Sequence, residues 1–335
     1  MSDAARRPIL LLANPASGGK PGAPPPLSDD PDALRPDALA AALVARGLRV
    51  SLHVLDEDDD PAELARRAVG EGSDVVVAGG DGTVGPVAEA LCNQEDATLG
   101  ILGLGSWNNI AHGFGLPSTL DEALDVIAAG GVARLDAGLA WHVPADEVER
   151  LDAGQVPPPD AARFFEAAGV GLDAEGFGAV QLGGRRGPWS AAHSLWRALR
   201  RRRTGMVVEL DGRRHRVTAP AITICNGPYL GMGFAVAPDA DPADGRLDVV
   251  VFERMGTLEV VRHFLAVARR RRRREPRVRH LRAQRVTVAG RRRTLPAHAD
   301  GRSIGATPVR FAVDPGALRV FRGAGGVAPD RGGMG

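Results

Sequence analysis

Three short segments of the sequence combine glycines with hydroxyl or amide side chains, a composition typical of phosphate-binding loops. They are Asn14-Pro15-Ala16-Ser17-Gly18, Gly79-Gly80-Asp81-Gly82-Thr83 and Gly103-Leu104-Gly105-Ser106-Trp107-Asn108. Glycines let the main chain approach a phosphate closely, and backbone N–H groups and hydroxyls can then donate hydrogen bonds to its oxygens. Asp81 can orient a terminal phosphate through a metal ion or a water molecule. A structural glycine-rich turn between a strand and a helix is the simpler alternative.

Each segment follows a short apolar run that is typical of a buried parallel strand, at residues 9–13, 74–78 and 99–102. A further strand is predicted at residues 50–55, and helices are predicted at residues 37–46, 61–71 and 121–129. The segment at residues 79–83 opens another helix, which runs to about residue 93. Alternating strands and helices indicate a doubly wound α/β lobe. Because ligands bind at the carboxyl ends of the strands in such sheets, we expect the three segments to converge on one edge.

Two common classes of nucleotide-binding protein are disfavoured by what the sequence lacks. It contains no Gly-x-x-x-x-Gly-Lys-Ser/Thr motif, and no Gly-x-Gly-x-x-Gly follows the first strand. The phosphate-binding loop of P-loop enzymes and the dinucleotide fingerprint of Rossmann folds are therefore both absent.

The pattern changes from residue 134 onward, where short β-like segments dominate. Strands are predicted at residues 163–168, 206–210, 221–225, 247–252, 285–288, 309–313 and 318–321. Amphipathic helices are predicted at residues 190–201 and 257–270, and a long loop at residues 144–161. We therefore expect a nucleotide-binding lobe at residues 1–133 and a mostly antiparallel β lobe at residues 134–325. An alternative assignment places the C-terminal segment in the first lobe.

Charge is distributed unevenly along the chain. Residues 1–160 hold 10 Lys+Arg and 26 Asp+Glu, a net charge of −16, whereas residues 161–335 hold 32 and 15, a net charge of +17. A basic half suits an anionic surface, and a membrane leaflet is favoured over nucleic acid because no aromatic stacking platform accompanies the arginines. A general enrichment in arginine is the alternative explanation, since the chain has a single lysine.

No segment predicts a membrane span or a secretion signal. No window holds the ~18 apolar residues that a span needs, and the apolar run at residues 9–13 is too short for a signal peptide. The two cysteines indicate neither a disulfide framework nor a zinc site. We therefore expect a cytoplasmic protein that associates peripherally with the inner face of the membrane.

The order of the motifs resembles the diacylglycerol kinase catalytic-domain family, which includes bacterial lipid kinases and the sphingosine and ceramide kinases. Besides the three glycine-rich segments, the chain carries Asn226-Gly227-Pro228-Tyr229, Asp244-Gly245-Arg246-Leu247-Asp248 and Ala299-Asp300-Gly301. The resemblance covers nearly the whole chain. It implies an N-terminal α/β lobe like that of NAD kinases and diacylglycerol kinases, followed by a lobe that holds lipid substrate and metal.

The resemblance also implies an activity, the transfer of a phosphoryl group from MgATP to the hydroxyl of a membrane lipid such as diacylglycerol. ATP would contact Asn14, Pro15, Ala16, Ser17, Gly18, Gly79, Gly80, Asp81, Gly82, Thr83, Gly105, Ser106 and Asn108. A structural Mg²⁺ would bind the Asp244 carboxylate and the main-chain carbonyls of Asp241 and Arg246, since oxygen ligands are what Mg²⁺ prefers. A plain Asp-Gly turn without an ion is the alternative. The sequence does not determine the oligomeric state, and a homodimer is one alternative.

Three positions depart from the family pattern. Gly85-Pro86 replaces Asn-Glu, Asn109 replaces an aspartate, and Arg302 replaces the glutamate that is thought to accept the substrate proton. A guanidinium stays protonated at any working pH, so Arg302 can neutralise phosphate charge but cannot accept a proton. Asp81 and Asp300 are the carboxylates that we nominate as substitute bases. Because positioning and electrostatics dominate phosphoryl transfer, losing the glutamate predicts a slow enzyme more readily than a dead one.

Two other functions stay open. One is a catalytically weak or inactive family member that binds nucleotide or lipid. The other is an NAD kinase, which shares the Gly-Gly-Asp-Gly-Thr lobe but fits the motifs of the second lobe less well.

Overall fold

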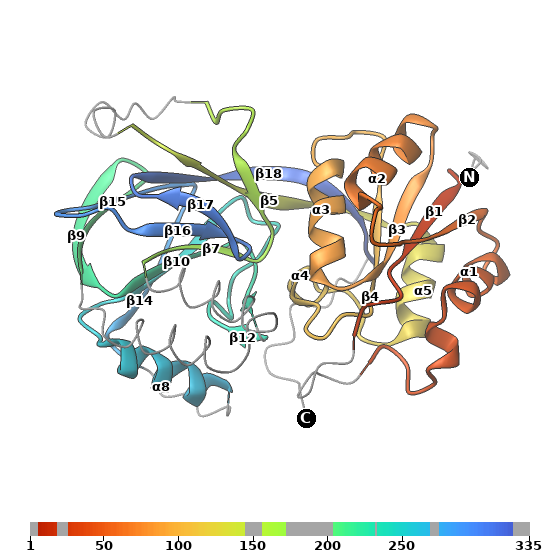
Figure 1. The fold of residues 1–335 in the computed structure, drawn as a ribbon, viewed down its shortest axis with the longest axis horizontal. Helices are drawn as coiled ribbons and strands as arrows, with labels where there is room; N and C mark the ends of the chain where they lie inside the picture. Colours follow the sequence, from red (N-terminus) through yellow and green to blue (C-terminus); the bar gives the residue numbers. More distant parts are fainter. Residues whose placement is uncertain are drawn as a thin grey trace. The chain divides into compact units, whose positions relative to one another are not determined.

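The computed structural model describes residues 6–18, 26–144, 156–171, 204–231, 233–268 and 275–323 (Figure 1). The chain divides into two compact units, Met1–Asp136 with Gly316–Gly335, and Ala137–Pro315. The division falls three residues after the expected boundary, and the C-terminal segment belongs to the first unit. The helix predicted at residues 190–201, most of the loop at 144–161 and the arginine run at 269–274 lie outside the described residues.

A parallel sheet forms the centre of the first unit. Its strands lie in the order β2 (Val50–Val54), β1 (Ile9–Ala13), β3 (Asp74–Gly79) and β4 (Leu99–Gly103). The end of β18 (Val309–Phe321) extends it beyond β4, with Val320 opposite Leu99. Every residue of β3 and β4 is buried, as expected for strands that are covered on both faces.

Helices cover both faces of this sheet, which makes the first unit the doubly wound lobe that the sequence predicts (Figure 1). On one face, α1 (Pro36–Ala45) and α5 (Leu120–Ala129) pack Leu39, Leu43, Leu124 and Ile127 against the sheet residues Ile9, Leu11 and Val76. On the other face, α2 (Pro61–Gly70) packs against α3 (Asp81–Leu91). Two short helices, η1 (Asp32–Leu34) and α4 (Asn109–Gly113), complete the unit.

The second unit is mostly antiparallel, as predicted, and its strands fall into two groups. The first has the order β14 (Val278–Ala283), β13 (Leu247–Phe252), β10 (Ala221–Cys225), β7 (Ala167–Gly171), β16 (Pro296–Ala299) and β17 (Arg302–Ala306). In the second, β15 (Arg285–Gly290) lies between β18 and β8 (Thr204–Leu210), and β9 (Arg213–Ala219) pairs with β8. β5 (Val132–His142) pairs with β18 and with β6 (Ala162–Phe164).

Inward-facing apolar residues of these strands form one core. Val170, Ile222, Ile224 and Val249 of the first sheet share it with residues of the second, including Met206, Val208, Val286, Val288 and Phe311, all of them buried. The Phe164 and Phe311 rings meet edge to face with centroids 6.4 Å apart, an arrangement that adds about 0.5–1.5 kcal/mol beyond the buried area. Outside the sheets lie the hairpin of β11 (Tyr229–Leu230) and β12 (Phe234–Ala235), and α8 (Thr257–Ala268).

The structure corrects two of the predicted strands. The strand predicted at residues 163–168 is interrupted at Phe165 and Glu166, which form a turn between β6 and β7. The two strands predicted at 309–313 and 318–321 are one continuous strand, β18, despite Pro315 and Gly316. No helix among the described residues is long and apolar enough to cross a membrane.

Candidate functional site

Asn14, the residue after β1, ties the first glycine-rich segment to the second. Its N–H donates to the carbonyl oxygen of Ala78 at the end of β3, at 2.9 Å. Its side-chain Nδ2 donates to Thr83 Oγ1 on α3 at 2.8 Å, and its Oδ1 accepts the N–H of Ala16 at 3.0 Å. The Asn14 side chain therefore both shapes its own loop and fixes that loop to the start of α3.

The second and third segments touch through their main chains. A Cβ added to Gly80 would lie 2.9 Å from Gly105 Cα, and a Cβ added to Gly105 would lie 2.4 Å from Gly80 Cα. The N–H of Leu104 also donates to the Gly79 carbonyl at 2.9 Å. Real Cβ atoms do not approach other atoms this closely, so the two loops can meet only because both residues are glycine.

The first segment approaches the third at Gly18. This residue has φ +102°, and a Cβ added to it would lie 3.0 Å from the carbonyl oxygen of Leu104. The carboxyl ends of β1, β3 and β4 thus bring all three segments together at one edge of the sheet, where α/β folds bind their ligands.

The start of α3 provides the polar centre of this edge. The Gly80 carbonyl accepts the N–H groups of Thr83 and Val84 at 2.8 and 2.9 Å. Gly82, in the first turn, is exposed, and a Cβ added to it would meet no atom within 4 Å. The N–H groups of the first turn and the positive end of the helix dipole form an electrostatic environment that suits a phosphate.

Asn108 holds the third segment in shape. It adopts a left-handed conformation with φ 50°. Its Oδ1 accepts the N–H of Gly105 at 2.8 Å, and its Nδ2 donates to the carbonyls of Gly103 and Gly105, both at 3.0 Å. The amide of Asn108 is therefore turned onto its own loop, whereas Ser17 and Ser106 are both partly exposed and can donate to a ligand.

Asp81 caps the short helix that follows the third segment. Its two carboxylate oxygens accept the N–H groups of Asn109 and Ile110, each at 3.0 Å. Burial raises the pKa of the Asp81 carboxyl, and these two N–H groups oppose the rise. Asp81 is thus a cross-link between the second and third segments, and its hydrogen bonds already engage both oxygens that a substitute base would use.

Asp300 has a similar cross-linking role in the second unit. It forms the turn between β16 and β17 with Gly301, at φ 43° and 73°, a conformation that Asp-Gly favours in two-residue hairpins. Its Oδ2 accepts the N–H of Phe165 at 2.7 Å, and its Oδ1 accepts those of Glu166 and Ala167 at 3.0 Å. These bonds bend the chain between β6 and β7.

Burial raises the pKa of Asp300 to about 6, while the three N–H groups and the charge of Arg302 oppose that rise. Both of its oxygens accept main-chain N–H groups, which gives Asp300 a structural role. Its nomination as a substitute base stays a prediction.

The turn that Asp300 creates contains Glu166, a residue that the motifs did not single out. It is partly exposed, and its carbonyl accepts the N–H groups of Asn226 and Gly227 at 3.0 and 3.1 Å. The available signal was a glutamate directly before the buried, alanine- and glycine-rich strand of residues 167–171. Arg302, by contrast, is exposed and donates from Nη2 to the carbonyl of Arg163 at 3.0 Å.

The predicted metal-binding residues lie in the loop before β13. Asp244 Oδ1 accepts the N–H of Arg246 at 2.9 Å, and the Asp241 carbonyl accepts the N–H of Asp244 at 3.4 Å. The second oxygen of Asp244 pairs with Arg282, which also reaches Asp248 at 3.6 Å. In the described part of the chain, no three His, Cys, Asp or Glu side chains are grouped to hold a metal. The predicted set uses only one carboxylate.

This loop nevertheless carries concentrated negative charge. Burial raises the pKa of Asp248 to about 6, and the nearby charges of Asp239 and Asp241 add to the rise. A cation would relieve this repulsion, so the oxygen donors and the charge of the loop fit Mg²⁺. Arg282 already supplies one positive charge to the same carboxylates.

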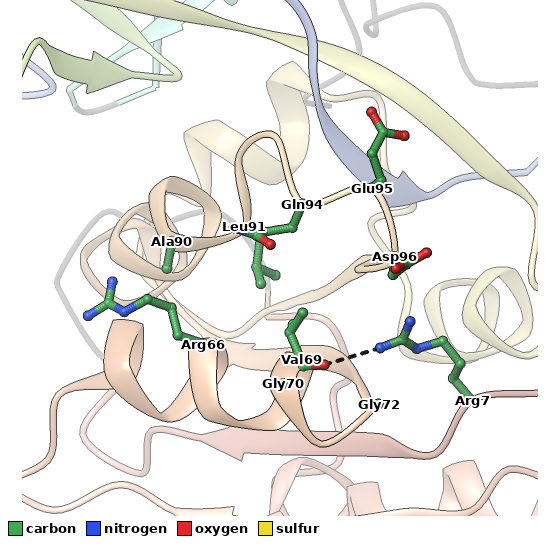
Figure 2. A pocket seen from close by; sticks show the side chains of 10 residues that line it. All are labelled: Arg7, Arg66, Val69, Gly70, Gly72, Ala90, Leu91, Gln94, Glu95 and Asp96. Carbon is green, nitrogen blue, oxygen red and sulfur yellow. Dashed lines mark hydrogen bonds between the residues drawn. The ribbon is translucent and has the colours of Figure 1, made fainter. Parts of the chain in front are cut away.

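A cavity of about 530 Å³ lies at the opposite edge of the first unit (Figure 2). Its lining includes Arg7, Gly72 and Asp96, which precede β1, β3 and β4, together with Arg66 and Gln94. Arg7 donates to the carbonyl of Val69 across it, at 3.4 Å. This cavity therefore lies at the amino ends of the strands, away from the glycine-rich segments, and is not the expected ligand edge.

Comparison with known proteins identifies both parts of this architecture. Residues 8–140 match the diacylglycerol kinase catalytic domain, and residues 169–322 match the YegS C-terminal NAD kinase beta sandwich-like domain. A solved diacylglycerol kinase structure from Bacillus anthracis has a TM-score of 0.68 at 18% identity, covering 96% of this chain and 98% of that one. An NAD kinase from Archaeoglobus fulgidus, solved with ATP, has a TM-score of 0.50 at 11% identity, covering 97% and 100%. The fold is thus that of the diacylglycerol and NAD kinases.

Among curated proteins, the Probable lipid kinase YegS-like of Pseudomonas aeruginosa is 28% identical over 313 residues, covering 86% of this chain and 89% of the relative. The Probable lipid kinase YegS of Shigella boydii is 38% identical over 94 residues, covering 27% of this chain and 31% of that relative's length. The chain thus combines a domain of the diacylglycerol kinase catalytic-domain family with a C-terminal domain of the YegS type.

The structural role of Asp300 makes a prediction about stability. Asp300→Ala should lower the free energy of unfolding by at least about 3 kcal/mol, because a buried donor that loses its partner costs about 1–3 kcal/mol and three are affected. Denaturant unfolding measures this difference. The exposed Asp160→Ala in the same unit is the control and should change stability by less than about 0.5 kcal/mol. A similarly small change for Asp300→Ala would contradict the assigned role.

Proposed function

We propose that this protein is an ATP-dependent lipid kinase that phosphorylates the hydroxyl of a membrane lipid such as diacylglycerol. The observation that carries the proposal is the convergence of three glycine-rich segments at the carboxyl edge of the first unit, in a chain of this family. The main-chain contact between Gly80 and Gly105 leaves the first turn of α3 open. That opening is where we expect the ATP phosphates.

The residues of this edge would have two roles, phosphate binding and loop positioning. The N–H groups of Gly82 and its neighbours, with the hydroxyls of Ser17 and Ser106, would donate to phosphate oxygens. Asn14, Thr83 and Asn108 hold the loops in place through the hydrogen bonds described above. Phosphoryl transfer needs positioning and charge stabilisation more than covalent chemistry, so a rigid cradle of donors is the main contribution expected of this unit.

The first prediction of this proposal uses Gly82. Gly82→Val should fold normally, because a Cβ there meets no atom within 4 Å, yet its side chain would occupy the space needed by the phosphates. We expect ATP binding and lipid phosphorylation to fall by at least about tenfold, equivalent to about 1.4 kcal/mol. The measurement is transfer of label from γ-labelled ATP with Mg²⁺ to a panel of lipids, followed by lipid separation.

Gly70→Ala is the matched control, since a Cβ at this helical position also meets no atom within 4 Å and lies outside the proposed site. ATP binding without lipid product would favour the alternative of an inactive binding protein. Label transferred to NAD would favour an NAD kinase. A Gly82→Val variant that bound and used ATP like the parent would contradict the proposal that the first turn of α3 binds the ATP phosphates.

We also propose that Mg²⁺ binds the loop before β13, through the Asp244 carboxylate and the carbonyls of Asp241 and Arg246. When bound, the ion would neutralise the acidic loop and fix its conformation. The rise in the pKa of Asp248 that burial and the charges of Asp239 and Asp241 cause supports a cation at this position, since it reflects repulsion that a cation would relieve.

The corresponding prediction concerns thermal stability. Millimolar Mg²⁺ should raise the melting temperature of the wild type, by about 2–4 °C for each kcal/mol of binding free energy. Asp244→Asn should abolish this response, because an amide oxygen is a weaker ligand for Mg²⁺ than a carboxylate. Asp160→Asn, which makes the same change at an exposed position, should retain it. An equal response in Asp244→Asn would refute the site, and so would a wild type that does not respond.

Peripheral binding to an anionic membrane is the third part of the proposal. It is supported by the net charge of +17 on residues 161–335 and by the exposed Arg213, Arg214 and Arg216 of β9, beside buried Val217. Basic residues close to an anionic leaflet contribute up to about 1 kcal/mol each. β9 is thus the described strand that we expect to face lipid.

Reversal of two of these charges tests the surface. Arg213→Glu with Arg216→Glu should weaken sedimentation with anionic vesicles by at least about tenfold, and binding of the wild type should fade in 1 M salt, where the screening length is about 3 Å. Arg35→Glu with Arg66→Glu makes the same change of charge on the first unit and should bind like the parent. Equal binding of the wild type to neutral and anionic vesicles at low salt would rule out the anionic membrane as a partner.

A further inference from the structure

Strand β2 ends the parallel sheet of the first unit, and among the described residues no strand pairs with its outer edge (Figure 1). Such an edge presents main-chain N–H and C=O groups to other chains, and proteins usually block it with charged residues, proline or a bulge. The strands at the other ends of the two large sheets, β9, β14 and β17, each contain arginine. β2, with the sequence Val-Ser-Leu-His-Val, contains no proline and no permanently charged residue. β2 is therefore the end strand that is open to pairing.

The main-chain groups of β2 that face this edge follow from its pairing with β1. The Arg49 carbonyl accepts the N–H of Ile9 at 2.8 Å. At the other end, the N–H of Leu55 donates to the Ala13 carbonyl at 2.8 Å. Because a strand has a period of two residues, the odd-numbered residues between 49 and 55 also direct their N–H and C=O groups to β1. The even-numbered residues direct theirs to the outer edge, and they are Val50, Leu52 and Val54.

The side chains of these three residues lie on one face of the sheet. The three residues are in register with Ile9, Leu11 and Ala13 of β1, which places them on the face that α1 and α5 cover. Leu52 and Val54 nevertheless remain 39% and 45% exposed. A further strand on this edge would therefore bury apolar surface as well as pair the main chain.

Charges of opposite sign flank β2. Arg46 and Arg49 precede it, and the acidic run Asp56–Asp60 follows it. Arg46 pairs with two aspartates of α5 in its own chain, whereas Arg49 is exposed. In an antiparallel pair of two β2 strands, the basic end of each strand would lie beside the acidic end of the other. The edge is thus complementary in charge to a second copy of itself.

We propose that β2 pairs antiparallel with β2 of a second copy of this chain, centred on Leu52. In this register Leu52 lies opposite Leu52 of the second copy, and Val50 lies opposite Val54. All three outward-facing residues of each copy are then paired, and apolar side chains meet apolar side chains on the same face. The two parallel sheets become one continuous sheet across a twofold axis. The inference is independent of the proposed kinase function, because it uses no residue of the phosphate-binding edge.

Both pairing and charge select this register. A register centred on Ser51 or His53 would pair only two of the three outward-facing residues of each copy. A shift by one residue would place apolar side chains opposite polar ones. In the proposed register, Arg49 lies diagonally across from Glu57 of the second copy, on the same face, where opposite charges attract.

Sedimentation velocity tests the interface. At micromolar concentration and low salt, the wild type should sediment with the mass of two chains. Leu52→Arg should raise the dissociation constant by at least about tenfold, because it places two like charges opposite each other at the centre of the pairing. Leu258→Arg makes the same change at a leucine of α8 that is 59% exposed, and it should sediment like the parent. A monomeric wild type, or a Leu52→Arg variant that dimerises like the parent, would overturn the proposal.

A charge exchange tests the antiparallel direction. Arg49→Glu should weaken dimerisation by about threefold or more, because it places a negative charge beside the acidic run of the second copy. The double change Arg49→Glu with Glu57→Arg should restore the affinity, since both copies then carry the exchanged pair. Dimerisation that is unaffected by Arg49→Glu, or that the double change does not restore, would contradict this direction.

Cysteine cross-linking tests the register. Leu52→Cys should form a disulfide between copies under mild oxidation, because Cα atoms of a hydrogen-bonded antiparallel pair lie about 5.5 Å apart, within disulfide range. Ser51→Cys, which is also exposed, is the control and should not cross-link, because the two copies of residue 51 would be offset along the strands. The native Cys92 and Cys225 are buried. Cross-linking of Ser51→Cys at least as readily as Leu52→Cys would overturn the register, and cross-linking of neither would overturn the interface.

Discussion

The contact between the main chains of Gly80 and Gly105 is the constraint on which the first unit depends. With Cα atoms this close, any side chain at either position would force the two loops apart. The contact fixes the spacing of the β3 and β4 loops, and Asp81 then joins the start of α3 to α4. The result is a surface of backbone N–H groups whose shape is set before any ligand arrives, which reduces the ordering cost of binding.

The second unit uses the carboxylate of Asp300 for the same purpose. Asp300 joins two turns that are 134 residues apart in the sequence, and its two oxygens accept three main-chain N–H groups. Replacing the family's glutamate leaves this arrangement intact. Asp300 and Gly301 shape the turn, and residue 302 is exposed and takes no part in these hydrogen bonds. The fold can therefore tolerate Arg302. How far its presence lowers the catalytic rate depends on whether another carboxylate accepts the substrate proton.

Sequence patterns predicted the first unit well, because its strands are short apolar runs such as Val75–Val76–Val77 that are buried on both faces. The convergence of the loops followed from the rule that parallel strands end at one edge. Sequence did not reveal that Asp81 and Asp300 act as cross-links, since their partners are main-chain N–H groups far away along the chain. For the same reason, the break at Phe165 and Glu166 could not be predicted from a segment that is locally β-like. Strand β9 was missed because its arginines hide the alternation around Val217.

The central claim is that nucleotide phosphates bind where the three glycine-rich segments meet. Amide hydrogen exchange with and without saturating MgATP tests it most directly, because the proposed ligands include backbone N–H groups, whose exchange slows when they are protected. The account predicts slower exchange at residues 14–18, 80–83 and 104–108, with little change at residues 66–72 and 90–96 around the cavity at the opposite edge. Bound nucleotide that leaves the glycine-rich segments unchanged, or that protects only the cavity residues, would contradict it.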